Sequence, residues 1–151
     1  MEIKITVNGG ESKKELGEKV IKAMQRATMT AMERIKTFED ACEDQGREPE
    51  YVLPYEPDTT DPEEINENAY VKLKTIIKSL NEGWVPDFSD SNQYKYYPWF
   101  KAVGSGLGLS FIGCAFDRSC SCVGSRLYLK SSELAEYAGK QFIEIYNQYN
   151  N

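Results

Sequence analysis

The chain has 151 residues, a length that suits one domain, and 40% of its residues are hydrophobic, enough to build a buried core. A net charge of −6 disfavours non-specific binding to nucleic acid, because phosphate binding needs a surplus of Lys and Arg. There is no histidine, which excludes Ser-His-Asp and Cys-His catalysis within one chain and removes the commonest metal ligand.

The first predicted elements are a short strand and a helix. Residues 2–7 alternate apolar and charged side chains, which predicts a strand rather than the apolar centre of a secretory signal. Ser12 and Glu15 have the spacing of a capping box, in which the two side chains satisfy free backbone donors of a helix start. A helix with one apolar stripe should follow to about Ala27.

A second capping box predicts a second helix. Thr30 and Glu33 have the same spacing, and Gly46 is placed to end a helix. Because residues 27–30 contain no strict helix breaker, one long bent helix is the alternative.

An acidic, proline-containing segment separates these helices from the next one. Residues 47–61 predict an exposed loop, attached to the rest of the protein by its apolar side chains. A helix start is predicted at Asp61, which is followed by Pro62 and by acids in the first turn. Gly83 predicts the end of this helix. The apolar side chains of the loop are Tyr51, Val52, Leu53 and Tyr55.

The C-terminal half predicts a sheet. Residues 94–103 and 107–116 are typical of two strands joined by a glycine-rich turn at 104–106. Pro98 cannot donate a hydrogen bond, so its strand should lie at an edge or carry a bulge. Residues 122–130 alternate as a third strand.

One more helix completes the predicted fold. Ser131 should cap it, its apolar side should extend to Tyr149, and Gly139 would allow close backbone packing. The predicted fold class is α+β, as one domain over residues 1–151: a small, mostly antiparallel sheet covered by three to four helices. The sheet is a C-terminal three-stranded meander, with the N-terminal strand as an optional addition.

Five aromatic side chains occupy seven positions at residues 94–100. Alternation along a strand should send some rings into the core and leave others outside, where they would form a binding surface. The basic side chains of the same sheet would add positive charge to such a surface; they are Lys95, Lys101, Arg118 and Arg126. The candidate ligand- or partner-binding residues are Trp84, Tyr94, Tyr96, Tyr97, Trp99, Phe100, Arg118 and Arg126.

We interpret the four cysteines as reduced, partly buried thiols rather than as metal ligands. Cys120 and Cys122 are two residues apart and would share a strand face, so a metal site with Cys114 is the alternative. We expect no metal and no cofactor. Residues 104–108 lack the Lys-Ser/Thr ending of a phosphate-binding loop.

Three acids lie near the aromatic region. We interpret them as turn residues, whose carboxylates accept hydrogen bonds from their own backbone; they are Asp87, Asp90 and Asp117. Weak cation binding or acid-base chemistry is the alternative.

Four segments resemble small proteins that have no assigned activity. The segments are residues 32–43, 81–87, 94–100 and 123–142, and the proteins occur in gut Bacteroidales, their prophages and related phages. The resemblance implies a phage or mobile-element origin and transfers no catalytic residue.

The first functional hypothesis is a phage- or prophage-encoded binding or assembly protein without catalytic activity. Its aromatic sheet face would dock a protein partner or a second copy, in the host cytoplasm or in a virion, without a membrane. The alternative is a counter-defence protein that sequesters a small nucleotide in a pocket lined by Tyr96, Trp99 and Arg126. An enzyme that uses carboxylates or the Cys120–Cys122 pair is a weaker third hypothesis.

Overall fold

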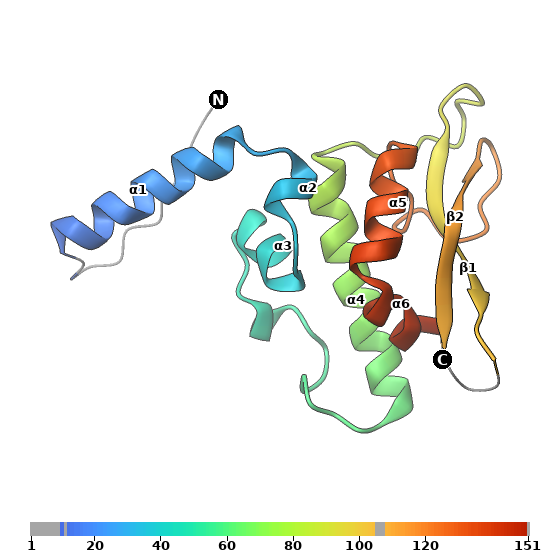
Figure 1. Cartoon of the computed structure of the whole chain (residues 1–151), viewed down its shortest axis with the longest axis horizontal. Coiled ribbons are helices and arrows are strands. Elements are labelled where there is room, and N and C mark those ends of the chain that lie inside the picture. The colour runs from blue at the N-terminus through green and yellow to red at the C-terminus, as the bar shows by residue number, and fades with distance from the viewer. Residues whose placement is uncertain (1–9, 11, 105–107, 151) are drawn as a thin grey trace.

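The structure is a computed structural model that describes residues 10, 12–104 and 108–150. Within these residues the protein is α+β, with six α-helices and one two-stranded antiparallel sheet (Figure 1). The predicted strand at 2–7 and the centre of the predicted 104–106 turn lie outside the described residues. The elements are α1 (Lys13–Thr28), α2 (Ala31–Arg34), α3 (Phe38–Asp44), the 3₁₀ turn η1 (Pro49–Tyr51), α4 (Pro62–Asn81), β1 (Lys95–Ala102), β2 (Leu109–Asp117), α5 (Ser132–Gln141) and α6 (Ile143–Asn150).

The capping box of α1 forms as predicted. The Glu15 backbone N–H donates to Ser12 Oγ (3.3 Å), and the Ser12 N–H donates to Glu15 Oε2 (2.7 Å). The helix ends because Met29 has an extended backbone, with ψ 146°. The alternative of one long bent helix through residues 27–30 is therefore wrong.

The second predicted helix is two short ones. Thr30 and Glu33 form their capping box, but Ile35 leaves the helical conformation with ψ 92°. Thr37 and Asp40 then form a further capping box, which starts α3. This break turns the Ile35 side chain fully into the core, and its burial stabilises the break.

The loop at 47–61 is only partly attached through its apolar side chains. Val52 is buried and Leu53 packs against the core, whereas Tyr51 is 80% exposed, which corrects its predicted anchoring role. The buried Asn68 of α4 holds the loop at its backbone instead, because its amide group bonds the backbone of Tyr55 and Glu56.

Helix α4 is the central element of the core. It begins at Asp61, whose carboxylate accepts from the Glu63 (2.9 Å) and Glu64 (3.3 Å) N–H groups, and it ends at Glu82 in the left-handed region. Both ends match the sequence prediction within one residue. Figure 1 shows α4 between α3 on one side and α5 and α6 on the other, with the sheet beyond.

Strands β1 and β2 form the predicted hairpin, and α5 and α6 cover one face of it (Figure 1). A Cβ atom added at Gly139 of α5 would lie 2.4 Å from the Phe111 ring and 2.8 Å from Pro98 Cβ. The glycine is therefore what lets α5 approach the sheet this closely, as its position predicted.

The predicted three-stranded meander is not confirmed. Beyond β1 and β2, the described residues add only an isolated bridge, in which Tyr96 and Leu129 exchange backbone hydrogen bonds of 3.0 and 2.8 Å. Pairing cannot continue past this bridge, because the next backbone position on that side of β1 is Pro98, which has no N–H. Leu127 instead donates to the Gly124 carbonyl inside a turn. The predicted third strand at 122–130 is thus a looped segment with one bridging residue.

Pro98 itself behaves as predicted. It lies on the side of β1 where pairing stops, and a bulge follows directly after Trp99. The extra residue of the bulge is Ile112 on β2, because Trp99 pairs with Gly113 and Phe100 pairs with Phe111.

The final predicted helix is interrupted. Ser131 caps α5 through a bond from the Leu134 N–H (3.3 Å), and Phe142 leaves the helical conformation before α6 begins. Phe142 is 4% exposed, so the break places its ring in the core. This break and the one at Ile35 explain why the described chain has six α-helices where three to four were predicted.

Candidate docking surface

The hairpin divides the aromatic run between its two faces. Tyr96 and Phe100 lie on the face that α5 and α6 cover, and the Phe100 ring contacts the buried Tyr146 ring at 4.8 Å between centroids. Tyr97 and Trp99 lie on the opposite, outer face, as alternation along a strand requires. Tyr96 and Trp99 therefore do not line one common pocket.

The looped segment that follows β2 covers the Tyr97 half of the outer face. The Tyr97 ring contacts the Tyr128 ring edge-on at 5.7 Å, and Tyr97 is 7% exposed. Asp117 holds the segment in place, since its carboxylate accepts from the Tyr128 hydroxyl and from the Cys122 N–H (3.3 Å). Burial raises the pKa of both tyrosines. Tyr97 is thus a buried packing residue, although the sequence made it a candidate for binding.

The other half of the outer face is open. Trp99 and Ile112 are each 51% exposed, and Val103 is 39% exposed. We call these three residues the outer patch. The bulge places Ile112 beside Gly113, directly across from Trp99, and a Cβ atom added at Gly113 would meet nothing within 4 Å. A large ring therefore projects next to a flat, unoccupied stretch of backbone.

A second group of exposed rings lies at the other end of the hairpin. Tyr94 (38% exposed) and Phe116 (51% exposed) meet edge-on at 4.8 Å between ring centroids. The Arg118 guanidinium lies 4.8 Å from the centre of the Tyr94 ring and donates to the Tyr94 hydroxyl (2.6 Å). We call Tyr94, Phe116 and Arg118 the end cluster, and Tyr96 touches it at 6.0 Å from Phe116.

The remaining candidate residues lie apart from both groups. Trp84 is half-buried just after α4, where its backbone N–H donates to the Asn81 backbone carbonyl (3.0 Å). Arg126 is exposed on the looped segment. The structure thus brings together Tyr94, Tyr96 and Arg118 of the predicted set and separates them from Trp99.

Sequence reasoning missed members of both groups. Ile112, Phe116 and Val103 are exposed, and the alternation of the second predicted strand was the available signal for Phe116. It also placed Lys95 on a charged binding surface, which is wrong. Lys95 is fully buried, and its ammonium donates to the backbone carbonyls of Asp90 (3.1 Å) and Gln93 (2.7 Å).

Asp87 and Asp90 bind nearby backbone, as the preferred interpretation predicted, whereas Asp117 also accepts from the Tyr128 hydroxyl. Asp87 accepts from the Ser89 hydroxyl (2.6 Å) and N–H (2.9 Å), which lowers the pKa of its carboxyl group. Asp90 accepts from the Asn92 N–H (2.8 Å).

The cysteines are all free thiols. Burial raises the pKa of Cys42 and Cys114, so these two are poor nucleophiles. Across residues 12–104 and 108–150, no three His, Cys, Asp or Glu side chains gather in a way that could hold a metal ion. The alternative of a metal site built on Cys114, Cys120 and Cys122 has no geometric support there.

Comparison with known proteins gives no relative: no family model, curated protein or solved structure matches the chain. In the described part of the chain, none of the helices combines the length and apolar character needed to cross a membrane.

Proposed function

We propose that this is a binding or assembly protein without catalytic activity, and that the outer patch is its docking surface. The observation that supports this proposal is the exposure of Trp99 and Ile112, each 51% accessible and adjacent across a hairpin whose other face is covered by helices. Exposed tryptophan beside aliphatic surface is typical of the centre of a protein interface.

The occupant that this shape favours is a second copy of the chain. Trp99 projects, and Gly113 across from it leaves its surface open. In a two-fold arrangement the Trp99 ring of each copy would cover Gly113 of the other, so one patch supplies both the projection and the space it fills. A different protein partner is the other form of this hypothesis.

Self-association through the outer patch can be measured with the purified protein. Sedimentation equilibrium should give a mass that rises towards twice the 17.2 kDa chain mass with concentration. The double variant Trp99→Ser/Ile112→Ser should weaken this association at least about tenfold, as expected when interface-centre residues are truncated. In a Trp84→Phe background, Trp99 fluorescence should shift to shorter wavelength as the dimer forms.

The end cluster supplies the matched control. Tyr94→Ser/Phe116→Ser removes a similar exposed aromatic area from the other end of the hairpin and should leave the association unchanged. If the protein stays monomeric at millimolar concentration, or if the control weakens association as much as the test variant does, the second copy is not the occupant. The proposal would then be that the outer patch binds a different protein.

The other functional hypotheses stay predictions. We propose the phage or prophage origin on the resemblance alone. Nucleotide sequestration has little geometric support, because Tyr96 and Trp99 face opposite sides of the sheet and the Arg118 guanidinium is bonded to Tyr94. A thermal-shift screen with nucleotides tests it, since a bound ligand raises the melting temperature.

A further inference from the structure

One edge of the hairpin has no neighbouring strand among the described residues. On the β1 side, the bridge to Leu129 occupies the backbone of Tyr96, and Pro98 has no N–H to offer. On the β2 side, no further strand pairs within residues 12–104 and 108–150. None of the β2 residues is buried, whereas β1 has three buried residues. Strand β2 is therefore the open edge of this sheet.

The register shows which backbone groups face the open edge. Tyr96 exchanges hydrogen bonds with Leu129 on the far side of β1, so its cross-strand partner Phe116 directs its own N–H and C=O away from β1. Cys114, two residues earlier on β2, has the same orientation. These groups have no hydrogen-bond partner among the described residues, and unpaired groups of this kind are a template for another strand.

The open part of the edge is short and uncharged. At one end, Asn147 of α6 closes it, because the Asn147 side-chain oxygen accepts from the Leu109 N–H (2.6 Å). The bulge at Ile112 interrupts the edge, which leaves residues 113–117 as its regular part. Charged residues and proline commonly protect an edge strand, and β2 has neither between residues 109 and 116.

Residues 2–7 are the remaining predicted strand of the sequence, and they lie outside the described part of the chain. Ile3, Ile5 and Val7 alternate there with polar residues, so one side of such a strand would be apolar. Their branched side chains are typical of strands. The length of this segment matches the regular part of the β2 edge.

The segment cannot reach β2 of its own chain while α1 is in place. The chain between residue 7 and Ser12 spans at most about 18 Å when fully extended. Helix α1 has 16 residues and is therefore about 24 Å long. Figure 1 shows α1 projecting from α2, with its start at the end of the molecule opposite to the sheet. The β2 edge within reach is thus that of a second copy.

We propose that residues 2–7 of one copy add as a third strand to the β2 edge of the next copy. Main-chain hydrogen bonds to Cys114 and Phe116 would supply affinity, and the alternating side chains would supply specificity. The Phe116 ring is 51% exposed and lies on the same side of the sheet as Tyr96. The apolar side of the added strand would cover this ring.

The positions of the two surfaces determine the kind of assembly. The added strand leaves one end of the molecule and the open edge lies at the other, so the contact is head-to-tail and builds an open chain of copies. The contact does not use the outer patch and does not rest on the proposed function. It should form at higher concentration than the outer-patch dimer, because a single added strand is marginally stable in water.

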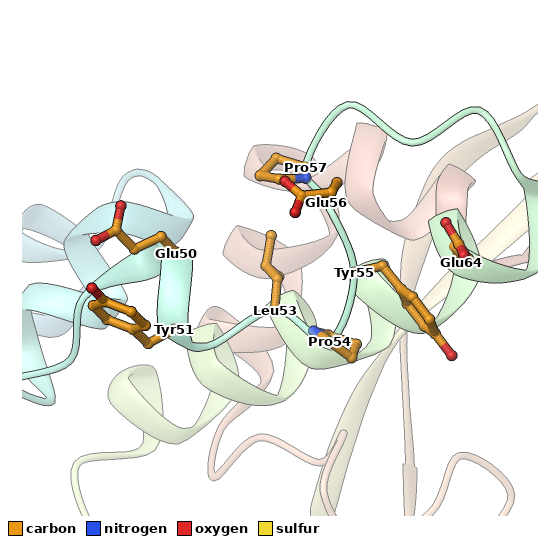
Figure 2. A pocket seen from close by; sticks show the side chains of 8 residues that line it. All are labelled: Glu50, Tyr51, Leu53, Pro54, Tyr55, Glu56, Pro57 and Glu64. Atoms are coloured by element: carbon orange, nitrogen blue, oxygen red, sulfur yellow. The ribbon is translucent and has the colours of Figure 1, made fainter.

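A hollow on the loop before α4 is a poorer acceptor for this segment. It has a volume of about 610 Å³, and Figure 2 shows the carboxylates of Glu50, Glu56 and Glu64 around it. Its lining is mostly polar, so it does not match the apolar side of the segment. It also offers no row of unpaired strand groups.

The experiment uses the full chain with Trp99→Ser/Ile112→Ser, which removes the outer patch and keeps the β2 backbone. In sedimentation velocity, the average mass should rise with concentration past twice the 17.2 kDa chain mass. Lys4→Pro/Ile5→Pro should raise the dissociation constant at least about tenfold, because one of two consecutive N–H groups in a strand faces its neighbour. The control Lys4→Gln/Ile5→Val removes the same charge, keeps both N–H groups and should stay within about threefold.

Mixing two blocked variants identifies the two partners of the contact. Phe116→Pro removes an N–H that faces away from β1, so it blocks the open edge and keeps the ladder of the hairpin. Phe116→Lys is the second edge variant, in case the proline prevents folding, because an edge lysine opposes strand addition. Each variant alone should be monomeric. A mixture of Lys4→Pro/Ile5→Pro with either edge variant should form a one-to-one dimer and nothing larger, because only one competent contact remains.

Three results would overturn the inference. The first is a monomer up to millimolar concentration in the Trp99→Ser/Ile112→Ser background, and the second is a mixture of blocked variants that stays monomeric. The third is slow exchange of the Cys114 and Phe116 amides in the monomer itself, which would mean that the edge is covered within one chain. All three are measured without the outer patch, so they leave the proposed function standing, and the two failures are distinguishable.

Discussion

Helices α1 and α5 have similar local sequence signals but differ in burial. Each begins at a serine N-cap, Ser12 or Ser131, each carries an apolar stripe, and each contains one internal glycine. Yet α5 buries four of its ten residues and packs against the hairpin, whereas α1 buries none. An amphipathic pattern thus specifies a helix and its apolar face, but not which surface packs against that face.

The largest expected difference between the two helices lies in their apolar side chains. Phe142, which ends α5 and is 4% exposed, should lower the free energy of unfolding by about 3–5 kcal/mol when changed to Ala. Ile21 of α1 is 58% exposed, and Ile21→Ala should change that free energy by less than about 0.5 kcal/mol. Urea unfolding of both variants measures the contrast. A cost of several kcal/mol for Ile21→Ala would mean that α1 is packed within the monomer.

The internal glycines should respond with opposite signs. Gly139→Ala places a Cβ atom 2.4 Å from the Phe111 ring and should destabilise the protein by about 1–3 kcal/mol. At Gly17 an added Cβ atom meets nothing within 4 Å, so Gly17→Ala should stabilise helix α1 by about 0.5–1 kcal/mol through helix propensity. Thermal unfolding followed by circular dichroism reports the first change, and amide exchange in α1 reports the second. Equal effects at both positions would contradict the close approach of α5 to the sheet.

A smaller effect is expected from the ion pairs of each helix. Glu43→Gln removes the partner of Lys22 and Arg26, so amide exchange in α1 should accelerate while global stability changes by less than about 1 kcal/mol. The control is Glu136→Gln, which removes the Lys140 pair within α5 (3.2 Å) and should leave amide exchange there unchanged, because packing holds that helix. Unchanged exchange in α1 would show that other contacts hold it.

The smallest expected effect is a pH dependence confined to the helix starts. The Ser12 backbone N–H lowers the pKa of Glu15 from its ordinary value of 4.5, and the Glu133 backbone N–H lowers the pKa of Glu133 in the same way. A carboxyl group with a lowered folded-state pKa stabilises the helix above the unfolded value, and this contribution is lost as the pH falls through the folded pKa. Acidification from pH 6 to 3 should therefore lower the amide protection factors of α1, which are corrected for the intrinsic exchange rate at each pH, well before those of α5, because packing holds α5 in place.

The variant that checks this assignment is Glu15→Gln. It keeps a hydrogen-bond acceptor without a titrating charge, so α1 should lose most of its pH dependence between these values. Retention of the full dependence would place its origin outside the capping box.

Much of the fold followed from local sequence signals. The capping boxes at Ser12 and Thr30, the Asp61 start of α4, the hairpin and the edge position of Pro98 were all predicted, because each depends on residues within a few positions along the chain. The breaks at Ile35 and Phe142 were missed, since each is stabilised by burying one side chain in a core assembled from distant segments.

The candidate docking surface was predicted less well. Tyr97 and Trp99 are both aromatic and lie on the same strand face. Only the looped segment held by Asp117 distinguishes them, because it buries Tyr97 and leaves Trp99 exposed. Sequence alternation cannot predict such a cover, because it depends on where residues twenty or more positions away return to the sheet.

The sequence by itself determined the starts of α1, α2, α4 and α5, the hairpin and the concentration of rings on it, because capping, turn and alternation chemistry act between near neighbours. Only the tertiary structure decided which rings stay exposed and which helix is left without a fully buried residue. Those outcomes depend on contacts between segments far apart in the chain, and burial on one side of an element is set by what packs there. Helices α1 and α5 carry the same signals and differ only in that cover.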